Sequence, residues 1–196
     1  MISNPAACTA AAFNPQSLRC PGGADSGDAC LSDAQLAVVN SWTTPAVFAN
    51  GTYRNAGWAL RGNEDDPAAW PAWVTGAGNV RVAGQYLFQD TTVKNYLARN
   101  PVADSLAYVP WDQDRVALDR LAALNDASDT DLRPFKNGGG KLILWHGLND
   151  AAVSDLATTE YYQRVIAALG GQPATDEFVR YYLAPGVNHC VGGPGR

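Results

Sequence analysis

The clearest hydrophobic pattern lies in the last third of the chain. An uninterrupted apolar run, KLILW at residues 141–145, stands between NGGG and HG, which is typical of a buried parallel strand. A second β-rich run, FVRYYL, covers residues 178–183. Between the two runs, Ser154 is placed to cap a helix whose apolar positions recur at helical spacing, and Gly170 with Gly171 ends it. Strand, helix and strand predict a βαβ unit.

The pattern is much less regular before residue 129. This part is rich in Trp, Gly and Pro, and the stretch GWALRGNEDDPAAWPAWVTGAG has no sustained period, so it predicts loops pinned by aromatic side chains. Ser32 and Gln35 form a capping-box pattern that predicts the start of a helix. A second helix is predicted from about Asp112 to Leu124. The change of pattern predicts an irregular loop-and-helix region over residues 1–128 and an α/β region over residues 129–196.

The two loops that follow the predicted strands carry the candidate chemistry. Ligand-binding and reactive residues of α/β sheets gather beyond the carboxyl ends of the strands. Asp150 follows the first strand and His189 follows the second, with one crossover helix between them, so we expect the two loops to lie side by side. An Asp followed by a His is the order in which α/β-hydrolases supply two members of a Ser-His-Asp triad. The alternatives are that Asp150 only caps the helix and that His189 is a turn residue.

The third member of such a triad is not found in the sequence. A nucleophilic serine is expected upstream in a G-x-S-x-G turn, and none of the serines has that surrounding. Ser26 lies in GADSGDAC, with the glycines misplaced, and Ser154 is accounted for as a cap. Too few strands are predicted before residue 141 for the front half of a hydrolase sheet.

Composition and charge limit the classes of partner. The chain has 196 residues, 46% of them hydrophobic, which is enough for a core, and a net charge of −5 without a Lys/Arg cluster. This charge argues against nucleic acid or an anionic membrane surface as a partner. The sequence contains no apolar run of membrane-spanning length and no recognisable signal peptide.

The four cysteines indicate disulfides. Their spacing does not suit zinc, and we expect Cys20 and Cys30 to close a short Pro/Gly loop. Disulfides imply an oxidising compartment, so a secreted or periplasmic protein is expected. The alternative is four unrelated buried thiols in a cytosolic protein; the other two are Cys8 and Cys190.

Together these segments resemble a known family. DLRPFKNGGGKLILWHGLNDAAVS, FVRYYLAPGVNHCVGGPG and, near the start, FNPQSLRCPGGADSGDACLSDAQLAVV are similar to the tannase and feruloyl esterase family, which also includes terephthalate monoester hydrolases. H-G-x-x-D is shared by many α/β-hydrolases, whereas His-Cys followed by G-G-P-G is more discriminating. The resemblance implies the C-terminal part of an α/β-hydrolase sheet, preceded by an irregular lid domain over residues 1–128.

The resemblance also implies roles for individual residues. Asp150 matches the triad acid and His189 the general base. Cys190 matches a cysteine bonded to the residue just before the nucleophilic serine, Cys20 and Cys30 match a disulfide within the lid, and Cys8 matches a cysteine whose partner lies upstream of this chain. The family binds a structural calcium in the lid through an acidic loop expected to lie upstream of Met1. The acidic run DASDTD at residues 126–131 is an alternative calcium site within the chain, but it is more simply a solvated helix end.

The lid-like region offers aromatic residues for an acyl group. Rings with polar rims suit a planar phenolic acid. The candidates are Trp73, Arg81, Tyr86 and Phe88, each with core packing as its alternative.

Three hypotheses of function follow. In the first, the chain is part of a serine ester hydrolase acting on feruloyl, galloyl or terephthalate esters, and is inactive alone because the serine and the oxyanion-hole segment are missing. In the second, it is a non-catalytic interaction fragment or one subunit of a split enzyme, for which an exposed sheet edge would favour association. In the third, it is a serine peptidase of the same fold, which the His-Cys pair and the aromatic lid disfavour.

Overall fold

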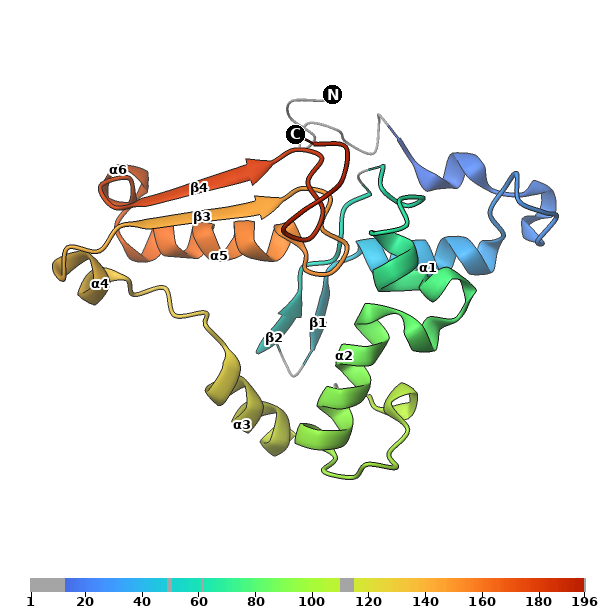
Figure 1. The fold of residues 1–196 in the computed structure, drawn as a ribbon, viewed down its shortest axis with the longest axis horizontal. Coiled ribbons are helices and arrows are strands. Elements are labelled where there is room, and N and C mark those ends of the chain that lie inside the picture. The colour runs from blue at the N-terminus through green and yellow to red at the C-terminus, as the bar shows by residue number, and fades with distance from the viewer. Residues whose placement is uncertain (1–12, 49–50, 61, 110–114, 196) are drawn as a thin grey trace.

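The computed structural model describes residues 13–48, 51–60, 62–109 and 115–195 of the chain (Figure 1). Strands β1 (Ala46–Phe48) and β2 (Tyr53–Asn55) form an antiparallel pair, and β3 (Leu142–Gly147) and β4 (Val179–Ala184) form a parallel pair. The helices are α1 (Asp33–Thr43), α2 (Gly84–Thr92), α3 (Arg115–Asn125), α4 (Arg133–Asn137), α5 (Asp155–Ala168) and α6 (Gln172–Thr175). Single turns of 3-10 or π-helix connect them, among them η4 (Pro71–Thr75) and η7 (Val93–Leu97).

The βαβ unit predicted from the sequence is confirmed. Strands β3 and β4 pair from Leu142 opposite Val179 to Gly147 opposite Ala184, and α5 runs along one face of this pair (Figure 1). Ser154 caps α5 by accepting a hydrogen bond from the amide of Leu156. The fully buried side chains of Val165 on α5 and Val179 on β4 form the centre of the small core of this unit.

The other face of the β3–β4 pair is uncovered. Ile143 is 69% exposed, Trp145 51% and Tyr182 56%. The prediction of a buried strand is therefore wrong for this side, and on the α5 side Leu142 and Leu144 are half-buried. The apolar run is the kind found in strands covered on both faces, but within the described residues only one layer of helix packs on the pair.

The region before residue 129 contains the predicted helices and some unpredicted elements. The capping box at α1 is confirmed, with Ser32 and Gln35 each bonding the other's backbone amide. Helix α3 is described from Arg115 onward, because residues 110–114 lie outside the described residues. Two apolar residues of α3 are exposed, Val116 at 68% and Leu124 at 78%. Its polar side instead contacts the β1–β2 hairpin, where Tyr53 donates a hydrogen bond to Asp119 over 2.5 Å.

Aromatic rings and a disulfide fix the irregular segments. Trp42 and Trp58 stack with their ring centroids 4.0 Å apart, and Trp70 meets Trp42 edge-on at 6.1 Å. The predicted bond between Cys20 and Cys30 is confirmed. No described helix has the length and apolarity that crossing a membrane requires.

Candidate active site

Asp150 lies in the loop between β3 and α5, where the sequence analysis placed it. The residue is only 8% exposed. Its Oδ1 accepts hydrogen bonds from the backbone amides of Ala152 at 2.8 Å and Val153 at 2.9 Å. The carboxylate thus caps the start of the next segment and is also held in one orientation, so the capping role and the proposed catalytic role are compatible.

His189 lies in the loop after β4 and meets Asp150 directly. Its Nδ1 is 2.8 Å from Asp150 Oδ2, although the two residues are 39 positions apart. Because the carboxylate only accepts, Nδ1 carries the proton and Nε2 is left as the site that takes up a proton. The His189 side chain is 39% exposed, and within the described part of the chain no hydrogen-bond partner contacts Nε2.

Gly147 allows the two loops to approach each other this closely. A Cβ at this position would lie 2.3 Å from the carbonyl oxygen of Val187. The backbone amide of Asn149 donates to the same carbonyl over 2.9 Å. The end of β3 and the His189 loop are therefore packed backbone to backbone, which only glycine permits at this position.

His146 is a second histidine on the same carboxylate, and the sequence analysis did not assign it a role. Its Nε2 is 3.1 Å from the carbonyl oxygen of Val153 and 3.3 Å from Asp150 Oδ2, and its Nδ1 is 2.8 Å from Thr158 Oγ1. Since both neighbours of Nε2 are acceptors, Nε2 carries a proton. The signal for this contact was the H-G-x-x-D spacing, which places His146 and Asp150 four residues apart across the strand end.

These contacts set the ionisation of the site. Burial opposes the charged form of Asp150, but hydrogen bonds from His146, the Val153 amide, His189 and the Ala152 amide outweigh it and lower the pKa of Asp150 to about 2. The hydrogen bond to Asp150 raises the pKa of His146 above its ordinary value, against the opposing effect of burial. Asp150 is consequently a carboxylate at neutral pH and a permanent acceptor for His189.

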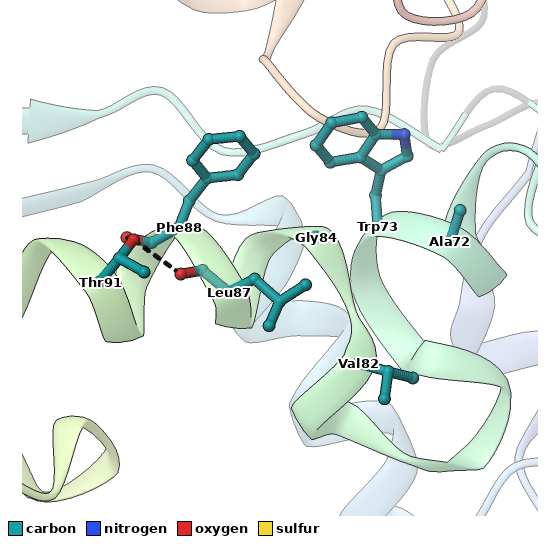
Figure 2. A pocket seen from close by; sticks show the side chains of 7 residues that line it. All are labelled: Ala72, Trp73, Val82, Gly84, Leu87, Phe88 and Thr91. Carbon is teal, nitrogen blue, oxygen red and sulfur yellow. Dashed lines mark hydrogen bonds between the residues drawn. The ribbon is translucent and has the colours of Figure 1, made fainter.

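The structure also contains an apolar pocket of about 490 Å³ (Figure 2). It is lined by Ala72, Trp73, Val82, Gly84, Leu87, Phe88 and Thr91. Trp73, from η4, and Phe88, from α2, present nearly parallel rings, with centroids 6.2 Å apart and 6° between their planes. The Trp73 ring also meets the His189 ring at 5.2 Å and 64°. Trp73 therefore joins the pocket to the Asp–His pair.

Two of the four predicted substrate-contacting residues are placed elsewhere. Trp73 and Phe88 line the pocket, whereas Arg81 and Tyr86 are not among its lining residues. Arg81 Nη1 donates to Tyr86 OH over 2.7 Å, and Tyr86 OH donates to Asp90 over 3.3 Å. The structure assigns this pair to a polar network on the surface next to the pocket.

Cys190, which follows His189, is an exposed free thiol with a backbone φ of 63°. The left-handed conformation is uncommon for a residue with a side chain. Cys8 lies outside the described residues, so the disulfide partners of both cysteines stay predictions.

Two further expectations concern the serines and the calcium. Ser154 Oγ donates to the carbonyl of Gly57, and Ser105 Oγ donates to Asp90, so neither is directed at His189. Among the residues that the structure describes, no three His, Cys, Asp or Glu side chains are grouped so that they could hold a metal ion. In the acidic run, Asp131 instead pairs with Arg133 at 2.6 Å.

Comparisons with known proteins agree on one family. The family described as "Tannase and feruloyl esterase" matches residues 1–196. The chain is 32% identical over 228 residues to the mono(2-hydroxyethyl) terephthalate hydrolase of Piscinibacter sakaiensis, covering 100% of the chain and 37% of that protein. It is 31% identical over 199 residues to a probable feruloyl esterase B-2 of Aspergillus terreus, covering 100% of the chain and 34% of that protein.

The fold is also similar to that of a solved esterase from Aspergillus oryzae. The TM-score is 0.75 at 25% identity, and the match covers 99% of the chain and 36% of that structure. The chain thus spans about a third of the length of the relatives that it matches.

Proposed function

Because the chain belongs to the tannase and feruloyl esterase family, we propose that residues 1–196 supply the Asp–His pair and an acyl-binding surface of a carboxylic ester hydrolase for aromatic esters. The single observation that carries the proposal is the 2.8 Å contact between His189 Nδ1 and Asp150 Oδ2. The parallel strands around this pair form the C-terminal part of an α/β-hydrolase sheet. The names of the relatives support esters of aromatic acids as substrates.

In the proposed reaction His189 moves the protons and Asp150 orients His189. Nε2 of His189 accepts the proton of a serine hydroxyl while the serine oxygen attacks the ester carbonyl. The proton then passes to the leaving alkoxide, which departs as an alcohol and leaves an acyl-serine. A water molecule then loses its proton to the same nitrogen and attacks the acyl carbon. The bond from the acyl carbon to the serine oxygen breaks, and that oxygen takes the proton back from His189, which releases the acid and restores the serine. The Asp150 carboxylate stabilises each positively charged state of His189 without itself taking up the proton.

The pocket that Trp73 and Phe88 help to line is proposed to hold the aromatic acyl group. The rings of Trp73 and Phe88 are nearly parallel and offer flat apolar surfaces against which a planar aromatic acyl group can pack. The edge contact from Trp73 to His189 would place the carbonyl of such an acyl group close to the general base. Feruloyl, galloyl and terephthalate groups all fit this description, and the proposal extends to the class rather than to one of them.

The nucleophilic serine is proposed to come from a segment outside these 196 residues. The sequence shows no G-x-S-x-G turn. The uncovered face at Ile143, Trp145 and Tyr182 supports this view, because an apolar face of this kind favours association with another part of a sheet structure. The same face supports the second candidate function, a non-catalytic fragment or subunit that acts by association.

Export is part of the proposal. The bond between Cys20 and Cys30 supports an oxidising compartment. In such a compartment the exposed Cys190 thiol would also form a disulfide, and we propose the segment that carries the serine as its partner.

Two assays test the proposal. In the first, the purified chain is incubated with methyl ferulate and methyl gallate beside its His189→Ala variant, and we expect no difference in turnover. In the second, the protein as its source organism produces it is treated with a fluorophosphonate, which labels activated serines, and is analysed by mass spectrometry without reductant. We expect ester turnover, a labelled serine outside residues 1–196 and a disulfide on Cys190.

The outcomes separate the candidates. Turnover by the purified chain above the His189→Ala control would overturn the external serine. A native protein that is neither labelled nor active on any aromatic ester would overturn the hydrolase and leave the association function. Ferulate binding, measured by quenching of tryptophan fluorescence, tests the pocket: Trp73→Ala should abolish binding, and the exposed Tyr96→Ala should not.

A further inference from the structure

A single turn of the lid region contacts both loops of the candidate site. Residues 63–66 form this turn, in which the backbone amide of Asp66 donates to the carbonyl of Asn63 over 3.2 Å. The two side chains at its ends bind different partners far along the chain. Both partners are asparagines, and each stands immediately before one residue of the Asp–His pair.

The first end of the turn holds the loop that carries Asp150. Asn63 Nδ2 donates to the backbone carbonyl of Asn149, 86 positions later. Asn63 is 3% exposed and Asn149 is 5% exposed, so the bond is shielded from water. A buried amide that lost this partner would keep the cost of its desolvation.

The second end of the turn holds the loop that carries His189. Asp66 Oδ2 accepts a hydrogen bond from Asn188 Nδ2 at 2.8 Å, 122 positions away. Asn188 is 2% exposed. The other carboxylate oxygen, Oδ1, accepts from the backbone amide of Ala68 at 2.9 Å, which fixes the orientation of the Asp66 side chain within its own segment.

We propose that Asn63 and Asp66 are positioning residues that set the contact between Asp150 and His189. The lid turn bridges the residues that precede the pair, and the backbone bond from the Asn149 amide to the Val187 carbonyl, at 2.9 Å, ties the two loops to each other. The turn, the Asp150 loop and the His189 loop are therefore each hydrogen-bonded to the other two. The turn fixes the positions of Asn149 and Asn188, the residues just before the pair, while Asp150 and His189 supply the chemistry.

This inference rests on the proposed function only in assuming that Asp150 and His189 act in catalysis. Its geometric content is that the hydrogen bond from His189 Nδ1 to Asp150 depends on a turn whose side chains bind the residues just before the pair, Asn149 and Asn188. A lid that merely adheres to the rest of the fold would contribute stability without controlling that bond. The two roles are distinguished by a signal that comes from His189 itself.

The histidine side chains provide that signal, because the chain has only two histidines. The full chain is labelled with ¹⁵N-histidine, and the ring N–H resonances and their exchange with water are followed by NMR. In Asn63→Ala and in Asp66→Ala we expect the Nδ1 proton of His189 to exchange about tenfold faster, the change that about 1.4 kcal/mol of lost hydrogen bonding produces. The His146 ring also contacts Asp150, so the folding of each variant is checked separately by near-ultraviolet circular dichroism.

Two more variants complete the design. Asp65→Ala changes the exposed carboxylate next to Asp66 and should leave the His189 signal as it is in the unaltered chain. Asp66→Asn keeps only one of the two acceptor oxygens, which bind the Asn188 side chain and the Ala68 amide, so it should restore only part of the protection that Asp66→Ala loses.

Unchanged His189 exchange in folded Asn63→Ala and Asp66→Ala would overturn the proposal, as would an equal effect of Asp65→Ala. If both alanine variants fail to fold and lose both histidine signals, Asp66→Glu decides. This variant keeps the charge but displaces it, and a His189 resonance identical to that of the unaltered chain would then refute the positioning role. None of these measurements needs a substrate, so a failure of ester hydrolysis leaves their result intact.

Discussion

Replacing Asp150 by asparagine tests the electrostatics of the site most directly. The amide has nearly the same shape as the carboxylate, but one of its two oxygens becomes an N–H donor. If the remaining oxygen keeps the amides of Ala152 and Val153, the new NH₂ group faces His189 Nδ1 and His146 Nε2. Donors then face donors, and His189 can accept only by moving its proton to Nε2, which is the wrong tautomer for a general base.

The pKa of Asp150 gives the size of the effect on stability. A carboxyl whose pKa falls from 3.8 unfolded to about 2 folded contributes roughly 2 kcal/mol to folding at neutral pH. Because the folded-state pKa is the lower one, this contribution is fully present well above 3.8 and is lost as the pH falls through about 2. By pH 3 about half of it should remain.

Urea unfolding followed by tryptophan fluorescence measures this contribution. Wild-type chain and Asp150→Asn are compared at pH 7, 5, 4 and 3, and the difference in the free energy of unfolding isolates Asp150 from the other carboxyls. We expect a difference of about 2 kcal/mol at pH 7 that shrinks to about 1 kcal/mol at pH 3. The exposed Asp65→Asn serves as the control. A difference below about 0.5 kcal/mol at pH 7, or one that grows as the pH falls, would refute the reasoning.

Two further predictions concern the neighbours of Asp150. The pKa of His146 is raised, chiefly by its hydrogen bond to Asp150, so its NMR titration should have a midpoint above 6.5 that falls in Asp150→Asn. The stability that His146 adds is present below pH 6.5 and is lost as the pH rises through the folded-state pKa. A midpoint below 6.5 would contradict this. Gly147→Ala should lower the free energy of unfolding by about 1–3 kcal/mol through the clash with the Val187 carbonyl. Gly138→Ala should lower it much less in the same urea assay, because a Cβ there would lie 3.5 Å from its nearest neighbour, the Phe135 carbonyl oxygen.

The local sequence was sufficient where a pattern repeats over several residues. The run at β3, the cap at Ser154 and the β-rich run at β4 predicted the βαβ unit, and the rule that carboxyl ends of parallel strands meet at one edge predicted that Asp150 and His189 are neighbours. The β1–β2 hairpin was missed because its strands have three residues each, which is too short for an alternation to show.

The remaining features depend on contacts between distant segments. Trp73 meets His189 across 116 positions, and no periodicity in either segment indicates that contact. Arg81 and Tyr86 lie in the same stretch of sequence as the residues that line the pocket, but they bond to each other and do not line it. The exposure of Ile143 could not be predicted either, because an apolar run indicates what a strand is suited to contact and not which layers are present.

The long separations between the lid turn and its partners also bear on how the chain folds. Pairing β3 with β4 closes a loop of 37 positions, from Leu142 to Val179, whereas the contacts of the turn across 86 and 122 positions require larger loops to close. During synthesis residues 63–66 leave the ribosome long before the asparagines they bind have been made. Until then the polar groups of residues 63–66 are hydrated, and the docking of this turn onto Asn149 and Asn188 is expected to be the last and slowest step of folding. If the ribosome stalls before residue 188, Asp66 lacks its partner Asn188, and chaperones rather than native contacts must protect the first half of the chain from aggregation.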